Sequence, residues 1–270
     1  MYRLIASDMD DTLLDGAGKL TKRTVDALRR AMDAGVYVVL ASGRMLESAR
    51  PFAEQIGVNA PMVLYNGAMV YDLAAQATVS SRFIPYETAK AICEKAEAED
   101  IYVQVYPGEG YFAREHTKYT DLYEASIKVE CGITGTPLSQ WITGGQVKML
   151  FIGEKEDTAG RIARFSEAFP DVSFMMSRPN YVEIVPKNVD KRYALEETIR
   201  HLGVKPEECV AFGDGQNDVS MLKYVGAGYC VENASQGVKD QCELFAPSNA
   251  EDGCARMIER LLDEGKLGKG

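Results

Sequence analysis

The stretch Tyr2-Arg-Leu-Ile-Ala-Ser-Asp8-Met-Asp10-Asp-Thr12-Leu-Leu14 decides the fold. A short apolar run of strand length ends there in three carboxylates within four residues. Carboxylates this dense beside an apolar strand repel one another and resist burial, so something must hold them in place. Because side chains alternate along a strand, we expect Asp8 and Asp10 to point the same way just beyond its end. Open α/β sheets bind their ligands at that edge, although Asp is also a common turn and helix-cap residue.

Composition and charge limit the kinds of protein that this chain can be. It has 270 residues, of which 46% are hydrophobic and 26% charged, as is typical of a globular protein with one large domain or two ordinary ones. The formal net charge of −10 argues against nucleic acid or a membrane surface as a partner. No apolar run has the length of a signal peptide or a membrane span, and the six cysteines are scattered. We therefore expect free thiols and a cytoplasmic location.

The first part of the chain has the pattern of a doubly wound sheet. Thr21 is expected to cap a helix that closes at Gly35, and the run 36–41 is typical of a strand buried on both faces. That strand ends in the turn Ser42-Gly43-Arg44, and a second helix is expected over 45–56. This alternation predicts an α/β fold with a doubly wound, Rossmann-like parallel sheet.

The middle of the chain shows an α+β pattern between Pro85 and Pro186. Helices are expected over 87–100 and 156–169, with strands beside them and an irregular polar, aromatic segment that runs to Trp141. About 100 residues is an ordinary domain size, so we interpret this part as an insertion. The predicted organisation is a core formed by residues 1–84 and 187–270, with an inserted α+β domain at 85–186.

Three of the predicted strands end in polar turns that contain glycine. After a helix that Asp190 can cap, the buried run 209–212 leads into Gly213-Asp214-Gly-Gln-Asn217-Asp218. If the three strands lie side by side, their turns meet at the carboxyl edge of one sheet. The carboxylates of Asp8, Asp10, Asp214 and Asp218 would then share one small pocket and repel one another strongly.

We expect a divalent cation to bind in this pocket and offset the repulsion. Clustered carboxylates without His or Cys favour Mg²⁺, which binds through a few carboxylates and keeps waters or phosphate oxygens as its other ligands. With Mg²⁺, Lys191 and Arg44 in place, the charge of the pocket comes close to zero, and a phosphate dianion can enter. The residues therefore predict a magnesium site that accepts phosphate groups.

The same residues resemble the four motifs of the haloacid dehalogenase-like (HAD) phosphatases. In chain order these are Asp8-Met-Asp10-Asp-Thr12-Leu, Ser42-Gly43-Arg44, Lys191 and Gly213-Asp214-Gly-Gln-Asn217-Asp218. The resemblance is closest to the Cof-type sugar-phosphate phosphatases, which carry a large α/β cap domain between the second and third motifs. The insertion predicted here lies at that place, and Asn66-Gly67-Ala68 also resembles the subfamily.

This resemblance implies a Mg²⁺-dependent phosphohydrolase that cleaves small phosphomonoesters, in particular sugar phosphates, through an aspartyl-phosphate intermediate. Asp8 resembles the family's nucleophile and Asp10 its general acid and base, with Lys191 as the third catalytic residue. The implied metal ligands are Asp8, the Asp10 backbone carbonyl, Asp214 and Asp218. The implied phosphate-binding residues are Met9, Ser42, Gly43, Arg44, Lys191 and Asn217.

Several alternatives stay open on the residues alone. A phosphomutase or a catalytically silent sugar-phosphate sensor would use the same scaffold. Asn66-Gly67 fits either a tight turn or a substrate contact, and Asp218 either binds the metal or supports its ligands. The expected partner is a small phosphorylated metabolite, with no nucleic acid and no membrane, and the expected assembly is a monomer or weak homodimer. Arg192 stands where the family often has a small residue, and we expect it to face solvent.

Overall fold

The structure, a computed structural model, describes residues 1–269 and divides into two compact units. The first unit comprises Met1–Arg44, Ala49–Ser80 and Asp190–Gly270, and the second comprises Met45–Ser48 and Ser81–Val189. Within residues 1–269, no helix combines the length and the apolar character that crossing a bilayer requires. The two units are described in turn.

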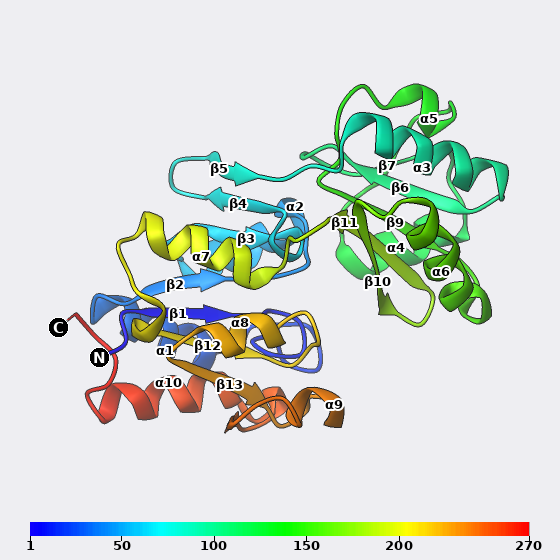
Figure 1. Ribbon diagram of the computed structural model, residues 1–270. Helices are drawn as coiled ribbons and strands as arrows, with labels where there is room; N and C mark the ends of the chain where they lie inside the picture. Colours follow the sequence, from blue (N-terminus) through cyan, green and yellow to red (C-terminus); the bar gives the residue numbers. More distant parts are fainter. Residues whose placement is uncertain (270) are drawn as a thin grey trace. The chain divides into compact units, whose positions relative to one another are not determined.

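The first unit is organised around a sheet of five parallel strands in the order β14-β13-β12-β1-β2. The strands are β1 (Leu4–Ser7), β2 (Tyr37–Leu40), β12 (Cys209–Gly213), β13 (Ala227–Val231) and β14 (Leu244–Ala246). Strand β1 lies between β2 and β12 (Figure 1), with Leu4 opposite Tyr37 on one side and Cys209 on the other. All four residues of β1 are buried, as its apolar sequence predicts.

Helices cover both faces of this sheet. They are α1 (Lys22–Asp33), α2 (Leu46–Ile56), α7 (Lys191–His201), α8 (Val219–Tyr224), α9 (Gln236–Lys239) and α10 (Gly253–Asp263). The connection β1-α1-β2 runs in one direction across the sheet and β12-α8-β13 in the other, so right-handed crossovers place α1 and α8 on opposite faces. Helices α7 and α8 share a core with Leu4 and Ala6, whereas α1 packs against α10. The predicted doubly wound fold is confirmed, as are the caps Thr21 and Asp190.

A small sheet follows β2 in the first unit. Its strands are β3 (Met62–Leu64), β4 (Met69–Asp72) and β5 (Ala77–Ser81), and a 3₁₀ turn, η1 (Tyr65–Gly67), joins β3 to β4. Ala41 forms a parallel bridge with Val63, so the turn after β2 and the turn η1 are held next to each other. The sequence did not predict β5, because its residues are mostly exposed and give no apolar alternation.

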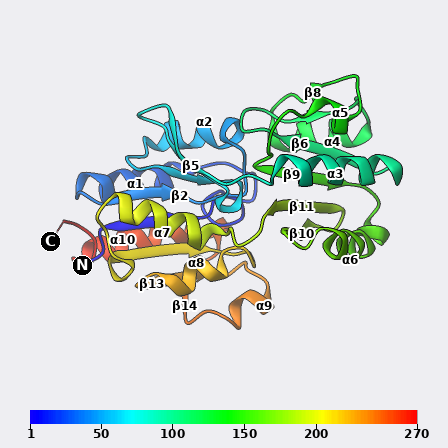
Figure 2. The same ribbon diagram turned by 45° about the horizontal axis from the view of Figure 1, so that its top comes forward.

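The second unit contains a six-stranded sheet in the order β10-β11-β9-β6-β7-β8, which is antiparallel except for the pair β7 and β8. The strands are β6 (Tyr102–Tyr106), β7 (Phe112–Ala113), β8 (Gly132–Ile133), β9 (Lys148–Ile152), β10 (Val172–Arg178) and β11 (Tyr181–Pro186). The helices are α3 (Tyr86–Ala98), α4 (Lys118–Ile127), α5 (Leu138–Trp141) and α6 (Thr158–Ala168). Helix α3 runs along β6 (Figure 2), and its apolar residues share a core with α5 and α6.

The prediction of an irregular segment up to Trp141 is wrong, because this part of the chain contains β7, α4, β8 and α5. Helix α4 begins at a capping box formed by Thr117 and Thr120 and ends at Lys128, whose φ is 58°. It buries only Thr120 and Tyr123, so it lacks the apolar stripe by which helices are recognised in a sequence.

The opposite face of this second sheet carries buried polar groups. The Lys148 ammonium lies 2.7 Å from a carboxylate oxygen of Glu183, and both side chains are almost fully buried. On the neighbouring strand β6, the Tyr106 hydroxyl donates to the Gln104 side-chain carbonyl at 2.8 Å. These pairs satisfy groups that would otherwise make burial of this face costly.

Gly67 lets the turn η1 lie against the start of α7. Its φ is +103°, and a Cβ atom there would lie 2.1 Å from the backbone oxygen of Asp190. We predict that Gly67→Ala lowers the free energy of unfolding by about 2–5 kcal/mol, because it adds backbone strain and overlap with a fixed carbonyl. Urea denaturation measures the loss.

Gly57→Ala is the matched control for this substitution. Gly57 also has a positive φ, +80°, but no atom lies within 4 Å of a Cβ built there. Gly57→Ala should lower the free energy of unfolding only by the cost of backbone strain, about 1–2 kcal/mol. Equal losses in the two variants would contradict the role given to the contact with Asp190.

Candidate active site

The three polar turns meet because β12, β1 and β2 are neighbours in the first unit. The Asp8 amide donates to the Phe212 carbonyl, and the Ala41 amide donates to the Ser7 carbonyl, so the hydrogen-bond ladders continue to the strand ends. Asp8, Ser42 and Asp214 therefore emerge from the same edge of one parallel sheet. The structure confirms the strand neighbourhood that the sequence predicts.

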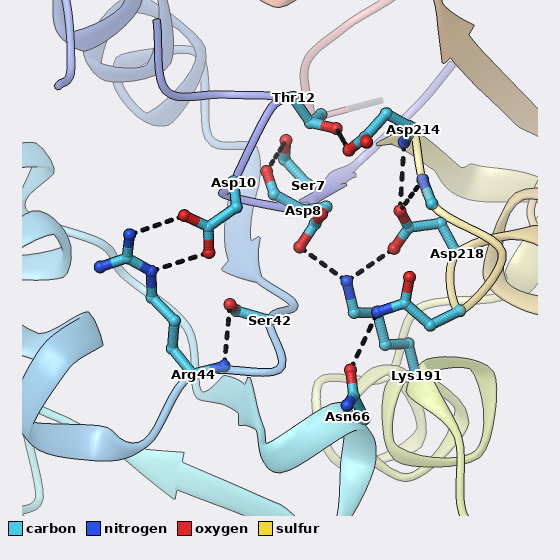
Figure 3. A network of polar contacts seen from close by, with 12 residues as sticks. Ser7, Asp8, Asp10, Thr12, Ser42, Arg44, Asn66, Lys191, Asp214 and Asp218 are labelled. Atoms are coloured by element: carbon cyan, nitrogen blue, oxygen red, sulfur yellow. Dashed lines mark hydrogen bonds and ion pairs between the residues drawn. The ribbon is translucent and has the colours of Figure 1, made fainter. Parts of the chain in front are cut away.

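Lys191 is the centre of the polar network shown in Figure 3. Its ammonium lies 2.6 Å from Asp8 Oδ1 and 2.6 Å from Asp218 Oδ1, and the Lys191 and Asp218 side chains are fully buried. Lys191 is the first residue of α7, whose N-cap Asp190 accepts from the Tyr193 amide at 2.7 Å. The cap fixes where α7 starts, and hence where the long side chain of Lys191 enters the network.

Asp218 shapes the turn that carries Asp214. One of its oxygens accepts from the Asp214 amide at 3.1 Å and from the Gly215 amide at 2.9 Å, while the other accepts from Lys191. A Cβ atom on Gly213 would lie 2.5 Å from the Asp218 Cβ, so the chain can close this tightly only with glycine at 213. The turn thus delivers the Asp214 carboxylate, which accepts from the Thr12 hydroxyl at 2.6 Å.

The carboxylates form a group of the right size for a small cation. One oxygen from each of Asp8, Asp214 and Asp218 lies within 4.8 Å of the others. If all three are ionised, the single ammonium of Lys191 leaves an excess of two negative charges. Three carboxylates are hard oxygen donors, so their chemistry fits Mg²⁺, and a charge of +2 would balance the excess.

Burial and this excess of negative charge together shift the pKa values of the group. Burial, followed by the charge of Asp218, raises the pKa of Asp8 well above its ordinary value, and the ammonium of Lys191 opposes that shift only in part. Burial also raises the pKa of Asp214 to about 6, although the hydrogen bond from Thr12 acts against it. Burial would lower the pKa of Lys191, but the charges of Asp218 and Asp8 outweigh it and raise that pKa.

Asp10 lies apart from this group and pairs with Arg44. The guanidinium donates to both carboxylate oxygens, from Nε to Oδ2 at 2.8 Å and from Nη2 to Oδ1 at 2.6 Å. Figure 3 shows Asp8 directed toward Lys191 and Asp10 toward Arg44. The expectation that Asp8 and Asp10 point the same way is therefore wrong, because β1 ends at Ser7 and the strand alternation does not reach them.

The remaining predicted phosphate-binding residues lie around the same edge. The Ser42 hydroxyl accepts from the Arg44 amide at 3.1 Å, and a Cβ on Gly43 would lie 2.9 Å from the Asn66 side-chain oxygen. The Asn217 amide group donates to that same Asn66 oxygen at 2.9 Å. The Met9 side chain is fully buried, so only its backbone is available to a ligand.

Sequence reasoning gave no role to Thr12 and left that of Asn66 open. Thr12 stands inside the first motif, and its bond to Asp214 joins the first motif to the fourth. Asn66 adopts φ 57° in the turn η1, a conformation that Asn tolerates, and its side chain is nearly buried. Arg192 faces solvent as expected, with its side chain half exposed and paired with Glu196.

Comparison with known proteins identifies the family. The sequence profile of the haloacid dehalogenase-like hydrolases matches residues 5–258. The chain belongs to this family. It is 30% identical over 242 residues to an HMP-PP phosphatase of Serratia proteamaculans, covering 88% of this chain and 87% of that protein.

Solved structures agree with this assignment. A haloacid dehalogenase-like hydrolase from Bacteroides thetaiotaomicron superposes with a TM-score of 0.89 at 27% identity, covering 97% of this chain and 100% of the other. A HAD subclass IIB sugar phosphatase superposes with a TM-score of 0.82 at 20% identity, covering 96% and 98%, and at this identity the likeness shows the fold alone. Family and relatives together make this HAD protein a phosphatase.

The raised pKa of Asp214 predicts how stability depends on pH. Between pH 4 and 6 the folded protein holds a proton on Asp214 that the unfolded chain releases, so the free energy of unfolding should fall as pH rises through this window. The share of this fall that is due to Asp214 should be about 2–3 kcal/mol. Denaturation in EDTA, without divalent cations, measures it. Asp214→Asn should remove this part of the pH dependence, and an unchanged slope in that variant would contradict the assignment.

Proposed function

We propose that this phosphatase cleaves small phosphomonoesters, sugar phosphates in particular, through an aspartyl-phosphate intermediate and with Mg²⁺ as its cofactor. The observation that supports this best is the network in which the Asp8 carboxylate is fixed by Lys191 next to Asp214 and Asp218. A buried carboxylate at a sheet edge, held by an ammonium, is suited to act as an oriented nucleophile.

The proposed reaction has two steps. An oxygen of Asp8 attacks phosphorus and forms the P–O bond of an aspartyl phosphate, while the P–O bond to the leaving alcohol breaks and Asp10 gives that alcohol a proton. Asp10 then takes a proton from water, whose oxygen attacks phosphorus, so that phosphate leaves and Asp8 is restored. Covalent catalysis thus splits one difficult hydrolysis into two easier displacements.

The proposed phosphate contacts come from both sides of Asp8. Ser42 and the Gly43 backbone would bind the phosphoryl oxygens from the turn after β2. Arg44, at the end of that turn, already donates to both carboxylate oxygens of Asp10. Lys191 and Asn217 would bind them from α7 and the fourth motif, with the Met9 backbone beside the nucleophile. Such positioned donors stabilise the charge that develops in phosphoryl transfer.

The proposed Mg²⁺ site uses the carboxylates of Asp8 and Asp214 and the backbone carbonyl of Asp10. Asp218 would support it from behind, because its oxygens already accept hydrogen bonds from Lys191 and two backbone amides. When bound, the ion would neutralise the carboxylates and phosphoryl oxygens that share this edge.

Three further predictions from the sequence stand beside this proposal. They are the limits of the cap domain, 85–186, a cytoplasmic location, and assembly as a monomer or weak homodimer.

The substrate class is tested with purified protein and a panel of phosphorylated metabolites. The panel should include sugar phosphates, nucleotides and a pyrophosphate, because one relative carries the name HMP-PP phosphatase and a structural neighbour that of sugar phosphatase. Release of inorganic phosphate is measured with Mg²⁺ present. Turnover confined to phosphoanhydrides would contradict the proposed phosphomonoester class.

Asp8→Asn should abolish turnover and leave the fold intact, because the neutral amide cannot act as the nucleophile. Phosphate release measures turnover, acid trapping of radiolabelled phosphoprotein measures the covalent intermediate, and circular dichroism checks the fold. Asp11→Asn is the matched control, since Asp11 belongs to the same acidic run but is exposed, and Asn tolerates its positive φ of 55°. More than a trace of activity in Asp8→Asn would reject covalent catalysis.

Removal of divalent cations by EDTA should abolish activity, and Mg²⁺ should restore it. Ca²⁺ should not, because its higher coordination number allows it to engage both oxygens of Asp8 and hide the nucleophile. Mg²⁺ should also raise the melting temperature of the wild type but not that of Asp214→Asn. Full activity in EDTA or with Ca²⁺ alone would count against the proposed metal site.

A further inference from the structure

In the pair formed by Asp10 and Arg44, the guanidinium binds both oxygens of an exposed carboxylate. The Asp10 side chain is 53% exposed, whereas that of Arg44 is 18% exposed. Two parallel N–H donors, at 2.8 Å and 2.6 Å, fix the carboxylate plane as well as its position. A lysine ammonium, a compact charge with rotatable donors, fixes position but not the plane of the carboxylate.

Arg44 is itself held at several points. Its backbone amide donates to the Ser42 hydroxyl, and its carbonyl accepts from the Tyr65 amide at 3.1 Å. Its guanidinium lies over the ring of Phe52 on α2, 4.9 Å from the centroid. The anchored member of the pair is therefore Arg44, and the exposed member that it orients is Asp10.

We propose that Arg44 is a positioning residue for proton transfer: it holds the Asp10 carboxyl group in the orientation needed to protonate the leaving alcohol. This inference rests on the role proposed for Asp10. It differs from the expectation that Arg44 binds the phosphate, because Arg44 would then assist every substrate alike. As an anchor for Asp10, it assists the first step, formation of the aspartyl phosphate, only for substrates whose leaving group needs a proton. The second step, hydrolysis of the intermediate, is the same for all substrates.

Two substrates separate these roles. Glycerol phosphate releases an alkoxide unless the leaving oxygen is protonated, whereas p-nitrophenyl phosphate releases a stable phenolate without a proton. The comparison uses kcat/KM, which reports formation of the aspartyl phosphate and not its hydrolysis. With Arg44→Met, kcat/KM for glycerol phosphate should fall about 100-fold, because a half-exposed acid without its anchor is poorly aligned. For p-nitrophenyl phosphate, kcat/KM should fall less than about threefold.

Two further variants control for charge and folding. Arg44→Lys keeps the positive charge but cannot form the two-point contact, so it should show the same dependence on leaving group with a smaller loss. Arg50→Met is the matched control, because Arg50, which lies on α2, is likewise placed over an aromatic ring, that of Tyr71, and pairs with a carboxylate, that of Glu54. It should leave the kinetics with both substrates within about twofold of the wild type.

A double-mutant cycle on glycerol phosphate tests whether Arg44 acts through Asp10. If it does, Arg44→Met combined with Asp10→Asn should be no slower than Asp10→Asn alone, whereas independent roles would multiply the two losses. Multiplied losses, or an equal fall in kcat/KM for both substrates, would overturn the inference.

The outcomes also distinguish this inference from the proposed function. Asp10→Asn should itself show the dependence on leaving group. If it does and Arg44→Met does not, the positioning role of Arg44 fails while the role of Asp10 stands. If Asp10→Asn lowers kcat/KM equally for both substrates, the general-acid role fails, and the inference about Arg44 falls with it.

Discussion

A buried ammonium between two carboxylates is the interaction on which the rest of this structure depends. Lys191, at the start of α7, contacts Asp8 and Asp218 at 2.6 Å each. Asp8 comes from the turn after β1 and Asp218 from the turn before α8. Neither the ammonium nor the fully buried Asp218 carboxylate could stay ionised there alone, since desolvation would cost several kcal/mol for each ion. Together they fix three distant segments of the first unit at one point.

The negative charge of the network is balanced only in part by Lys191, and this excess of charge affects how its carboxylates titrate. Asp8 and Asp214 have raised pKa values because burial and Asp218 outweigh the single lysine. A protein that needed only stability would do better with apolar residues in these places. Asp10, in contrast, is matched by Arg44 and stands outside the group. Two acids of one motif thus receive different environments from different cations.

The sequence predicted the parts of this molecule that follow from periodicity and from sheet topology. The buried apolar runs around Leu4, Val38 and Val210 predicted the parallel sheet. The polar turns that follow them predicted that Asp8, Ser42 and Asp214 lie near one another. It did not predict α4 or β5, whose residues are too exposed to show a pattern. Nor did it predict the pairing of Asp10 with Arg44 or of Thr12 with Asp214, because such contacts depend on where side chains point after a strand has ended.

The position of β1 also has a consequence for synthesis on the ribosome. Leu4 pairs with Cys209, and Asp8 pairs with Lys191, so β1 must wait for the distal part of the chain before one of its edges is covered. The strands of the second unit's sheet, in contrast, all lie between Tyr102 and Pro186 and can pair as soon as that segment emerges. The order of emergence and the order of folding therefore differ, and during translation one edge of β1 stays open to intermolecular pairing until β12 emerges.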